Sequence, residues 1–163
     1  MVGLRGRSER GGLQRFYPPL KTYVYIDGFN LYYGAVRKTS FKWLDLNRLM
    51  GVLLPRDHVV QIRYFTALVR GGNDPASPLR QQIYFRALRT LPNISIHFGH
   101  FLQQVVSMRL VTPIGNTRFV KVYKFEEKGS DVNLATNMLV DGFAGAYEQA
   151  VIVSNDSDLL EPK

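Results

Sequence analysis

Four aspartates from three parts of the sequence could together hold a divalent cation. Asp27 directly follows a short apolar run, Asp156 and Asp158 stand just after another, and Asp131 stands where a long helical segment begins. Carboxylate oxygens with retained waters are the ligands that Mg²⁺ or Mn²⁺ prefers. A metal held in this way can activate water and bind a phosphoryl oxygen, so these residues indicate hydrolysis of a phosphodiester.

Each of these aspartates also has a simple structural explanation. Asp27 followed by Gly28 is typical of a turn, and Asp156 or Asp158 could cap a helix. Asp131 could be an ordinary first-turn acid, which the helix dipole favours. The catalytic interpretation holds only if the carboxylates meet, because crowded like charges raise one another's pKa values unless a cation neutralises them.

The elements that must position the aspartates alternate between strands and helices. Runs rich in β-branched and aromatic residues predict strands at residues 23–26, 59–69, 94–101 and 151–153. Caps and apolar spacing predict helices at residues 31–37, 46–54, 77–91 and 132–147. This alternation predicts an α/β domain of three layers around a mostly parallel sheet. Asp27 and the pair Asp156 and Asp158 would then lie beyond the carboxyl ends of their strands, where the working residues of such sheets gather.

The helix predicted at residues 77–91 offers a candidate surface for phosphate. Leu79, Ile83 and Ala87 share a face that is expected to be the apolar, packed face. Arg86 and Arg89 lie on another face, where they would contact phosphate or simply be solvated.

The charge distribution favours a polyanionic partner. The 163 residues carry a net charge of +8, residues 75–125 contain no acid, and residues 126–163 contain eight. A basic surface beside an acidic centre suits nucleic acid, and solubility alone is the alternative. The chain has no cysteine, which excludes disulfides and thiolate metal sites.

The remaining segments bear on organisation and location. Residues 1–21 are rich in Gly and Arg and predict a flexible basic arm, which leaves residues 22–163 as the domain. Residues 105–125 predict a β-hairpin that could be a nucleic-acid clamp or an oligomer contact. We find no signal peptide and no run of ~20 apolar residues, so a soluble cytoplasmic protein is expected.

Three short blocks link these observations to a known family. The blocks are YIDGFNLYYG at 25–34, EEKGSDVNLAT at 126–136 and VIVSNDSD at 151–158. Together they resemble the NYN domain, in the LabA-like branch of the PIN-like nucleases, and the likeness runs from about Thr22 to the end of the chain. The resemblance implies a PIN-like, Rossmann-like fold and a Mg²⁺- or Mn²⁺-dependent ribonuclease.

The resemblance also implies roles for individual residues. The acidic positions and the polar residue of the first block correspond here to Asp27, Asp131, Asp156, Asp158 and Asn30. Lys128 and Ser154 would hold phosphate or water beside these acids. Tyr32, within the first block, would either stack on an exposed RNA base or pack in the core.

Two departures from the family pattern favour an alternative to ribonuclease activity. Asn137 stands where many NYN sequences carry a further acid, which predicts weaker metal binding. The chain stops at Lys163, where a PIN-like domain is expected to continue into a helix and a strand. A truncated edge of the sheet would invite self-association. The alternative function is therefore a catalytically weak or inactive RNA-binding or regulatory module of the same fold.

Overall fold

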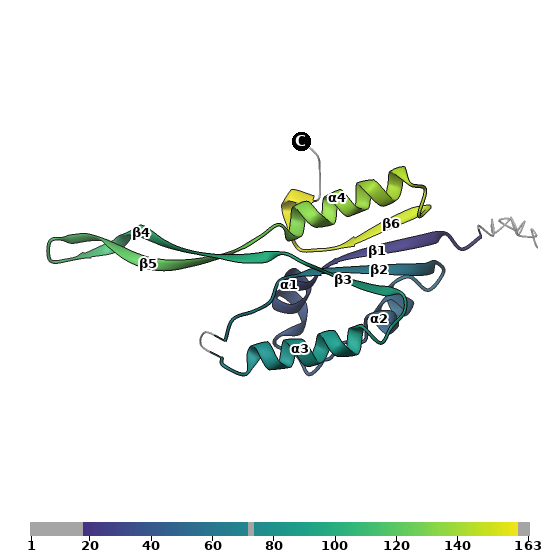
Figure 1. Ribbon diagram of the computed structural model, residues 1–163, viewed down its shortest axis with the longest axis horizontal. Coiled ribbons are helices and arrows are strands. Elements are labelled where there is room, and N and C mark those ends of the chain that lie inside the picture. The colour runs from purple at the N-terminus through teal and green to yellow at the C-terminus, as the bar shows by residue number, and fades with distance from the viewer. Residues whose placement is uncertain (1–17, 72–73, 160–163) are drawn as a thin grey trace, which may run out of the picture.

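Four parallel strands form the central sheet of the protein. The computed structural model describes residues 18–71 and 74–159, and its sheet has the order β3-β2-β1-β6 (Figure 1). The strands are β1 (Lys21–Asp27), β2 (His58–Thr66), β3 (Ile94–Phe98) and β6 (Gln149–Val153). All neighbouring strands in this sheet run parallel, which confirms the predicted α/β class. The predicted basic arm lies outside the described residues as far as position 17.

Helices cover both faces of the sheet. One face carries α2 (Leu46–Leu53) and α3 (Ser77–Leu88), and the other carries α4 (Ser130–Phe143) (Figure 1). Successive strand residues point to opposite faces, so Val24 and Ile26 pack in the core beneath α2 and α3, whereas Tyr25 packs with Leu134 of α4. Within the described residues, no helix has the length and apolar character needed to cross a membrane.

The face of α3 that packs on the sheet differs from the predicted one. Phe85 is buried, whereas Leu79 is 61% exposed and Ile83 is 39% exposed. The prediction was wrong because the packed face also contains Gln81 and Tyr84. Their amide and hydroxyl groups bond to backbone groups of the loops after β2 and before α2, so these polar side chains are packed with their hydrogen bonds satisfied.

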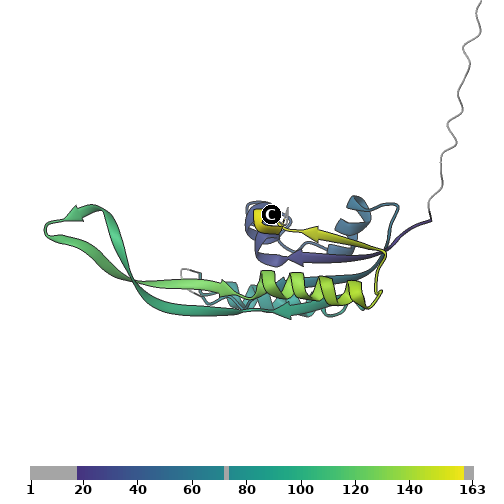
Figure 2. The ribbon, with the colours of Figure 1, turned by 90° about the horizontal axis from the view of Figure 1, so that it is seen from above.

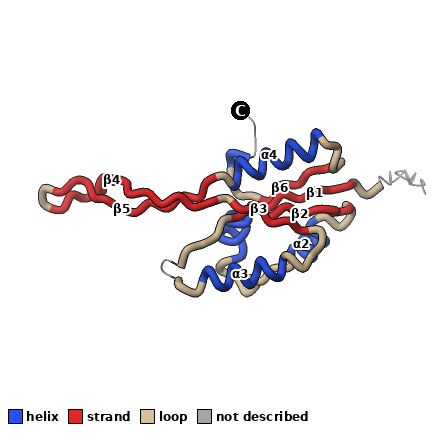
Figure 3. The backbone as a smooth tube through the Cα atoms, viewed as in Figure 1, coloured by secondary structure: helices blue, strands red, loops and turns tan. Residues whose placement is uncertain are grey.

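A two-stranded antiparallel hairpin projects from one end of the sheet. It consists of β4 (His100–Ile114) and β5 (Thr117–Lys128), and Figures 2 and 3 show it extending well beyond the helices. Both strands are longer than predicted. Gly115 in the turn has φ 56°, a left-handed conformation that glycine adopts without strain. In the part of the chain that the structure describes, no helix lies along the projecting hairpin (Figures 1 and 3), and most of its large apolar side chains are exposed.

The order of the sheet reverses between β1 and β6. The chain passes from β1 to β2 and β3 on one side, whereas β6 joins on the other side of β1. Ile26 pairs in register with Val153, so the residues after these two strands leave the sheet side by side. In open α/β sheets such a reversal forms a crevice at the carboxyl ends, where ligands bind. The short elements here are α1 (Gly28–Asn30), the π-helix η1 (Leu31–Val36) and the 3₁₀-helix η2 (Ser157–Leu159).

Candidate active site

Asp27 ends the central strand β1 and is buried, with 3% of its surface exposed. Its Oδ1 accepts a hydrogen bond from the backbone N–H of Asn30 at 3.0 Å, which caps α1. Its Oδ2 accepts from the side-chain amide of Asn30. Asn30 is therefore a direct partner of Asp27 and orients its carboxylate. Each carboxylate oxygen retains acceptor capacity for a further ligand.

The turn after β6 lies next to this pair. Ser154 accepts a hydrogen bond on Oγ from the backbone N–H of Asp156 at 3.0 Å, which holds the turn. Ser154 and Asn155 line a small cavity of about 250 Å³ together with Asn30. The structure thus brings two predicted residues, Asn30 and Ser154, to one cavity from opposite ends of the domain sequence.

Asp131 belongs to the first turn of α4. The loop after α4 lies at the start of β1, as shown by the hydrogen bonds between Glu148 of that loop and the backbone of Lys21. The first turn of α4 therefore lies at the opposite, carboxyl end of the sheet (Figure 1). By strand alternation, Asp27 is on the same face of the sheet as Tyr25, which is the face that α4 covers. The elements that carry the predicted metal ligands thus share one end of the sheet.

The donor atoms at this end suit a hard cation, although they do not form an all-protein cage. Among the side chains that the structure describes, no group of three or more histidines, aspartates or glutamates is placed to hold a metal ion. Asp158, in η2, is outside the described side chains. Mg²⁺ usually binds through one or two carboxylates, with waters and substrate phosphates completing its shell. The oxygen donors of the residues at this end fit a Mg²⁺ site of this kind, in which the protein supplies only part of the coordination shell.

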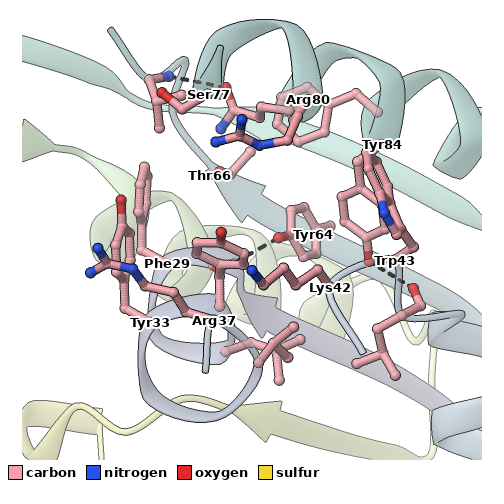
Figure 4. A pocket seen from close by; sticks show the side chains of 18 of the residues that line it. Phe29, Tyr33, Arg37, Lys42, Trp43, Tyr64, Thr66, Ser77, Arg80 and Tyr84 are labelled. Atoms are coloured by element: carbon pink, nitrogen blue, oxygen red, sulfur yellow. Dashed lines mark hydrogen bonds between the residues drawn. The ribbon is translucent and has the colours of Figure 1, made fainter. Parts of the chain in front are cut away.

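A larger cavity of about 770 Å³ opens beside the segment that follows Asp27 (Figure 4). The aromatic residues on its walls include Phe29, Tyr32, Tyr33, Trp43, Tyr64 and Tyr84. Tyr32, predicted to stack on a base or pack in the core, is thus a wall residue of this cavity. Sequence reasoning missed the cavity because its walls come from separate segments. The available signal was the crowding of aromatic residues between positions 29 and 43.

The predicted phosphate-binding cations lie apart from both cavities. Lys128 Nζ is 2.9 Å from Oε2 of Glu126, and Lys124 and Lys128 lower the pKa of Glu126 to about 2. Arg86 and Arg89 are exposed at the end of α3 and line neither cavity. A phosphate contact by these residues stays a prediction.

Comparison with known proteins decides the family. A model of the NYN domain matches residues 21–162. The chain belongs to the NYN domain family. This confirms the family inferred from the three sequence blocks, and the parallel sheet is consistent with the nuclease-like fold of NYN domains.

A curated protein that is named as a monooxygenase is also similar to this NYN chain. It is 35% identical over 170 residues to 6-hydroxy-3-succinoylpyridine 3-monooxygenase HspA of Pseudomonas putida (strain DSM 28022 / S16). The match covers 86% of this chain and 54% of the relative, so the chain spans about half the length of that protein. No solved structure matches the chain.

At Gly28 the backbone of the NYN domain lies close to the ring of Tyr64. A Cβ at this position would lie 2.6 Å from the hydroxyl of Tyr64, a buried side chain that donates to the Gly28 carbonyl at 3.5 Å. We predict that Gly28→Ala lowers the free energy of unfolding by about 1–3 kcal/mol, because the ring or α1 must shift. Gly34→Ala is the matched control, since nothing lies within 4 Å of a Cβ there. Urea denaturation measures both, and equal stabilities would contradict the steric argument.

A buried ion pair on the α4 face of the NYN domain was not predicted from the sequence. Arg63 of β2 donates from Nη2 to Asp141 of α4 at 2.6 Å, and the Tyr25 hydroxyl donates to the same carboxylate at 2.7 Å. Burial, together with this bond, raises the pKa of Tyr25. His97 stacks on Phe65, and burial and nearby Arg63 lower the pKa of His97. The network ties the far end of α4 to the sheet.

Proposed function

We propose that this NYN domain is a metal-dependent ribonuclease that hydrolyses the phosphodiester bonds of RNA. The observation that carries the proposal is the reversal of sheet order between β1, which ends in Asp27, and β6, which leads to Ser154 and Asp156. The first turn of α4, with Asp131, begins at the same end of the sheet. The nuclease-like fold of the family and the net charge of +8 support an anionic substrate at this end.

Each residue at this end has a defined part in the proposed reaction. The proposed metal ligands are Asp27, Asp131, Asp156 and Asp158. When bound, Mg²⁺ or Mn²⁺ would supply a nucleophilic water at neutral pH and neutralise charge on the phosphoryl group. Asn30 keeps the carboxylate of Asp27 oriented through its two hydrogen bonds. Ser154 holds the turn that carries Asp156.

The hairpin is the proposed contact surface for the remainder of the RNA. Arg109 is opposite Phe119 in the register of β4 and β5, and Lys121 and Tyr123 follow on the same face. Phe119 is 60% exposed and Tyr123 is 67% exposed. Exposed rings beside cations are typical of surfaces that bind single-stranded nucleic acid. The other face is apolar around Met108, which would suit the oligomer contact that is the alternative role of the hairpin.

Incubation of the purified protein with labelled single-stranded RNA tests the ribonuclease proposal. We expect cleavage with Mn²⁺ or Mg²⁺ and none with excess chelator, because the metal generates the nucleophile. RNA that is retained by the protein but uncut under every condition would support the binding module instead. RNA that is neither bound nor cut would contradict both.

A second candidate function is the oxygenation of a small aromatic compound. The relative from Pseudomonas putida is named as a monooxygenase of a pyridine derivative, and aromatic rings and cations line the large cavity of the NYN domain. Monooxygenation places one atom of dioxygen on the substrate and reduces the other to water, so it needs a two-electron donor. Dioxygen uptake that depends on a pyridine substrate and an added reductant would favour this candidate. RNA cleavage without any reductant would favour the nuclease.

A further inference from the structure

The large cavity lies beside the proposed catalytic end and has the size of a ligand site. Its volume of about 770 Å³ falls within the range of ~300–1,000 Å³ that is usual for ligand pockets. Gly28 and Phe29, which follow Asp27 directly, border it. A ligand in this cavity would therefore lie beside the segment that follows Asp27, although Asp27 itself is not on the cavity wall.

Two pairs of aromatic rings form facing parts of the wall. Phe29 and Tyr33 are stacked, with ring centroids 6.0 Å apart and an interplanar angle of 9°. Trp43 and Tyr84 meet edge to face at 6.4 Å, and Figure 4 shows this pair across the cavity from the first. Tyr33 is 52% exposed and Trp43 is 55% exposed, so ring surface on both sides is accessible to a planar ligand. Aromatic walls of this kind stack on bases without strong dependence on sequence.

Cations stand beside these rings. Arg37, Lys42 and Arg80 all border the cavity. Arg80 forms an ion pair with Asp74, whereas Arg37 and Lys42 form no ion pair with any residue that the structure describes. The guanidinium of Arg37 lies 5.3 Å from the centroid of the Tyr33 ring. Asp74 is the one carboxylate among the described lining residues, and its pKa is lowered by its bond to Arg80 and, to a smaller extent, by the charge of Arg37. The cavity therefore combines accessible rings with more positive than negative charge.

We propose that this cavity binds one nucleotide of the RNA substrate, with its base against the aromatic walls and a phosphate held by Arg37 and Lys42. The inference rests on the proposed ribonuclease function and adds a nucleotide-binding subsite beside the cut. The chemistry that the cavity recognises is a planar ring that carries an anionic group. A free aromatic acid shares this chemistry, so the test must distinguish it from a nucleotide.

Trp43 provides a direct readout of occupancy, because it is the single tryptophan of the chain. Its fluorescence is recorded during titration with nucleoside 5′-monophosphates, with the matched nucleosides and with nicotinate. We expect a saturable change with at least one monophosphate and at least about tenfold weaker binding of its nucleoside, because the charge-assisted phosphate bonds are lost. The absence of any saturable change, or tighter binding of nicotinate than of every nucleotide, would overturn the proposal.

Matched variants test the phosphate contact and the aromatic contact of the site separately. Arg37→Gln and Tyr33→Ala are each expected to weaken nucleotide binding about tenfold, whereas Tyr33→Phe keeps the ring and should bind as the wild type does. Arg48→Gln is the charge control, because Arg48 lies on α2 outside the cavity and its side chain is 90% exposed. Circular dichroism establishes that each variant is folded. Equal affinities of Arg37→Gln and Arg48→Gln would overturn the phosphate contact.

Asp27→Asn separates failure of this inference from failure of the ribonuclease proposal. Because Asp27 does not line the cavity, the variant should lose RNA cleavage and keep its nucleotide affinity. Cleavage by the wild type without nucleotide binding would overturn the nucleotide site alone. Nucleotide binding without RNA cleavage would overturn the ribonuclease and support the cavity as a nucleotide site.

Discussion

Asp27→Asn should reduce the rate of RNA cleavage by about 10³-fold or more. The variant removes the negative charge at the end of β1, and with it the anionic ligand that the proposed metal site needs. The fold should persist, because asparagine is as good a helix N-cap as aspartate and its carbonyl oxygen can still accept from the backbone N–H of Asn30. Initial rates on labelled RNA with Mn²⁺, together with circular dichroism, measure both effects.

Asp57→Asn is the matched control for this variant. Asp57 precedes β2 at the amino end of the sheet, where its carboxylate accepts from the amide of Gln149 at 3.4 Å. Loss of this charge should leave RNA cleavage unchanged, because the proposed site is at the opposite end. If Asp27→Asn and Asp57→Asn cleaved RNA equally well, Asp27 would have no role in the reaction.

Asp141→Asn should lower the free energy of unfolding by about 3–5 kcal/mol. The side chains of Arg63 and Asp141 are only 21% and 11% exposed, so loss of the carboxylate charge leaves a guanidinium in the interior without its counter-ion. The Tyr25 hydroxyl also loses its charged acceptor. Urea denaturation at neutral pH measures the change, and RNA cleavage per folded molecule should remain because the pair is distant from the carboxyl end of the sheet.

Two further variants separate the ion pair from the rest of this network. Tyr25→Phe removes one hydrogen bond and should cost about 1–2 kcal/mol. The double variant Arg63→Met with Asp141→Leu removes both charges and should recover much of the loss seen with Asp141→Asn. A cost for Asp141→Asn no greater than that for Tyr25→Phe would show that the buried charge pair contributes little to stability.

The strands β1 and β6, and the polar residues that follow them, were predictable from local patterns, whereas β2 and β3 each end three residues earlier than predicted. A parallel strand covered on both faces is mostly apolar, so an acidic or polar residue directly after an apolar run often marks where the strand leaves the sheet. The structure confirms this at β1, which ends in Asp27, and at β6, which ends just before Ser154. The three sequence blocks were likewise sufficient to identify the NYN family. Whether the four aspartates share a metal stays a prediction.

The packed face of α3, the buried ion pair and the large cavity depended on the tertiary structure. Gln81 packs against the loop after β2 because Ala67 and Val69 satisfy its amide. Asp141 is buried because Arg63, far away in the sequence, neutralises it. The cavity exists because segments that contribute one or two rings each come together at the end of β1. Hydrophobic periodicity records how apolar a residue is, whereas the burial of a polar group depends on a partner that only the folded chain supplies.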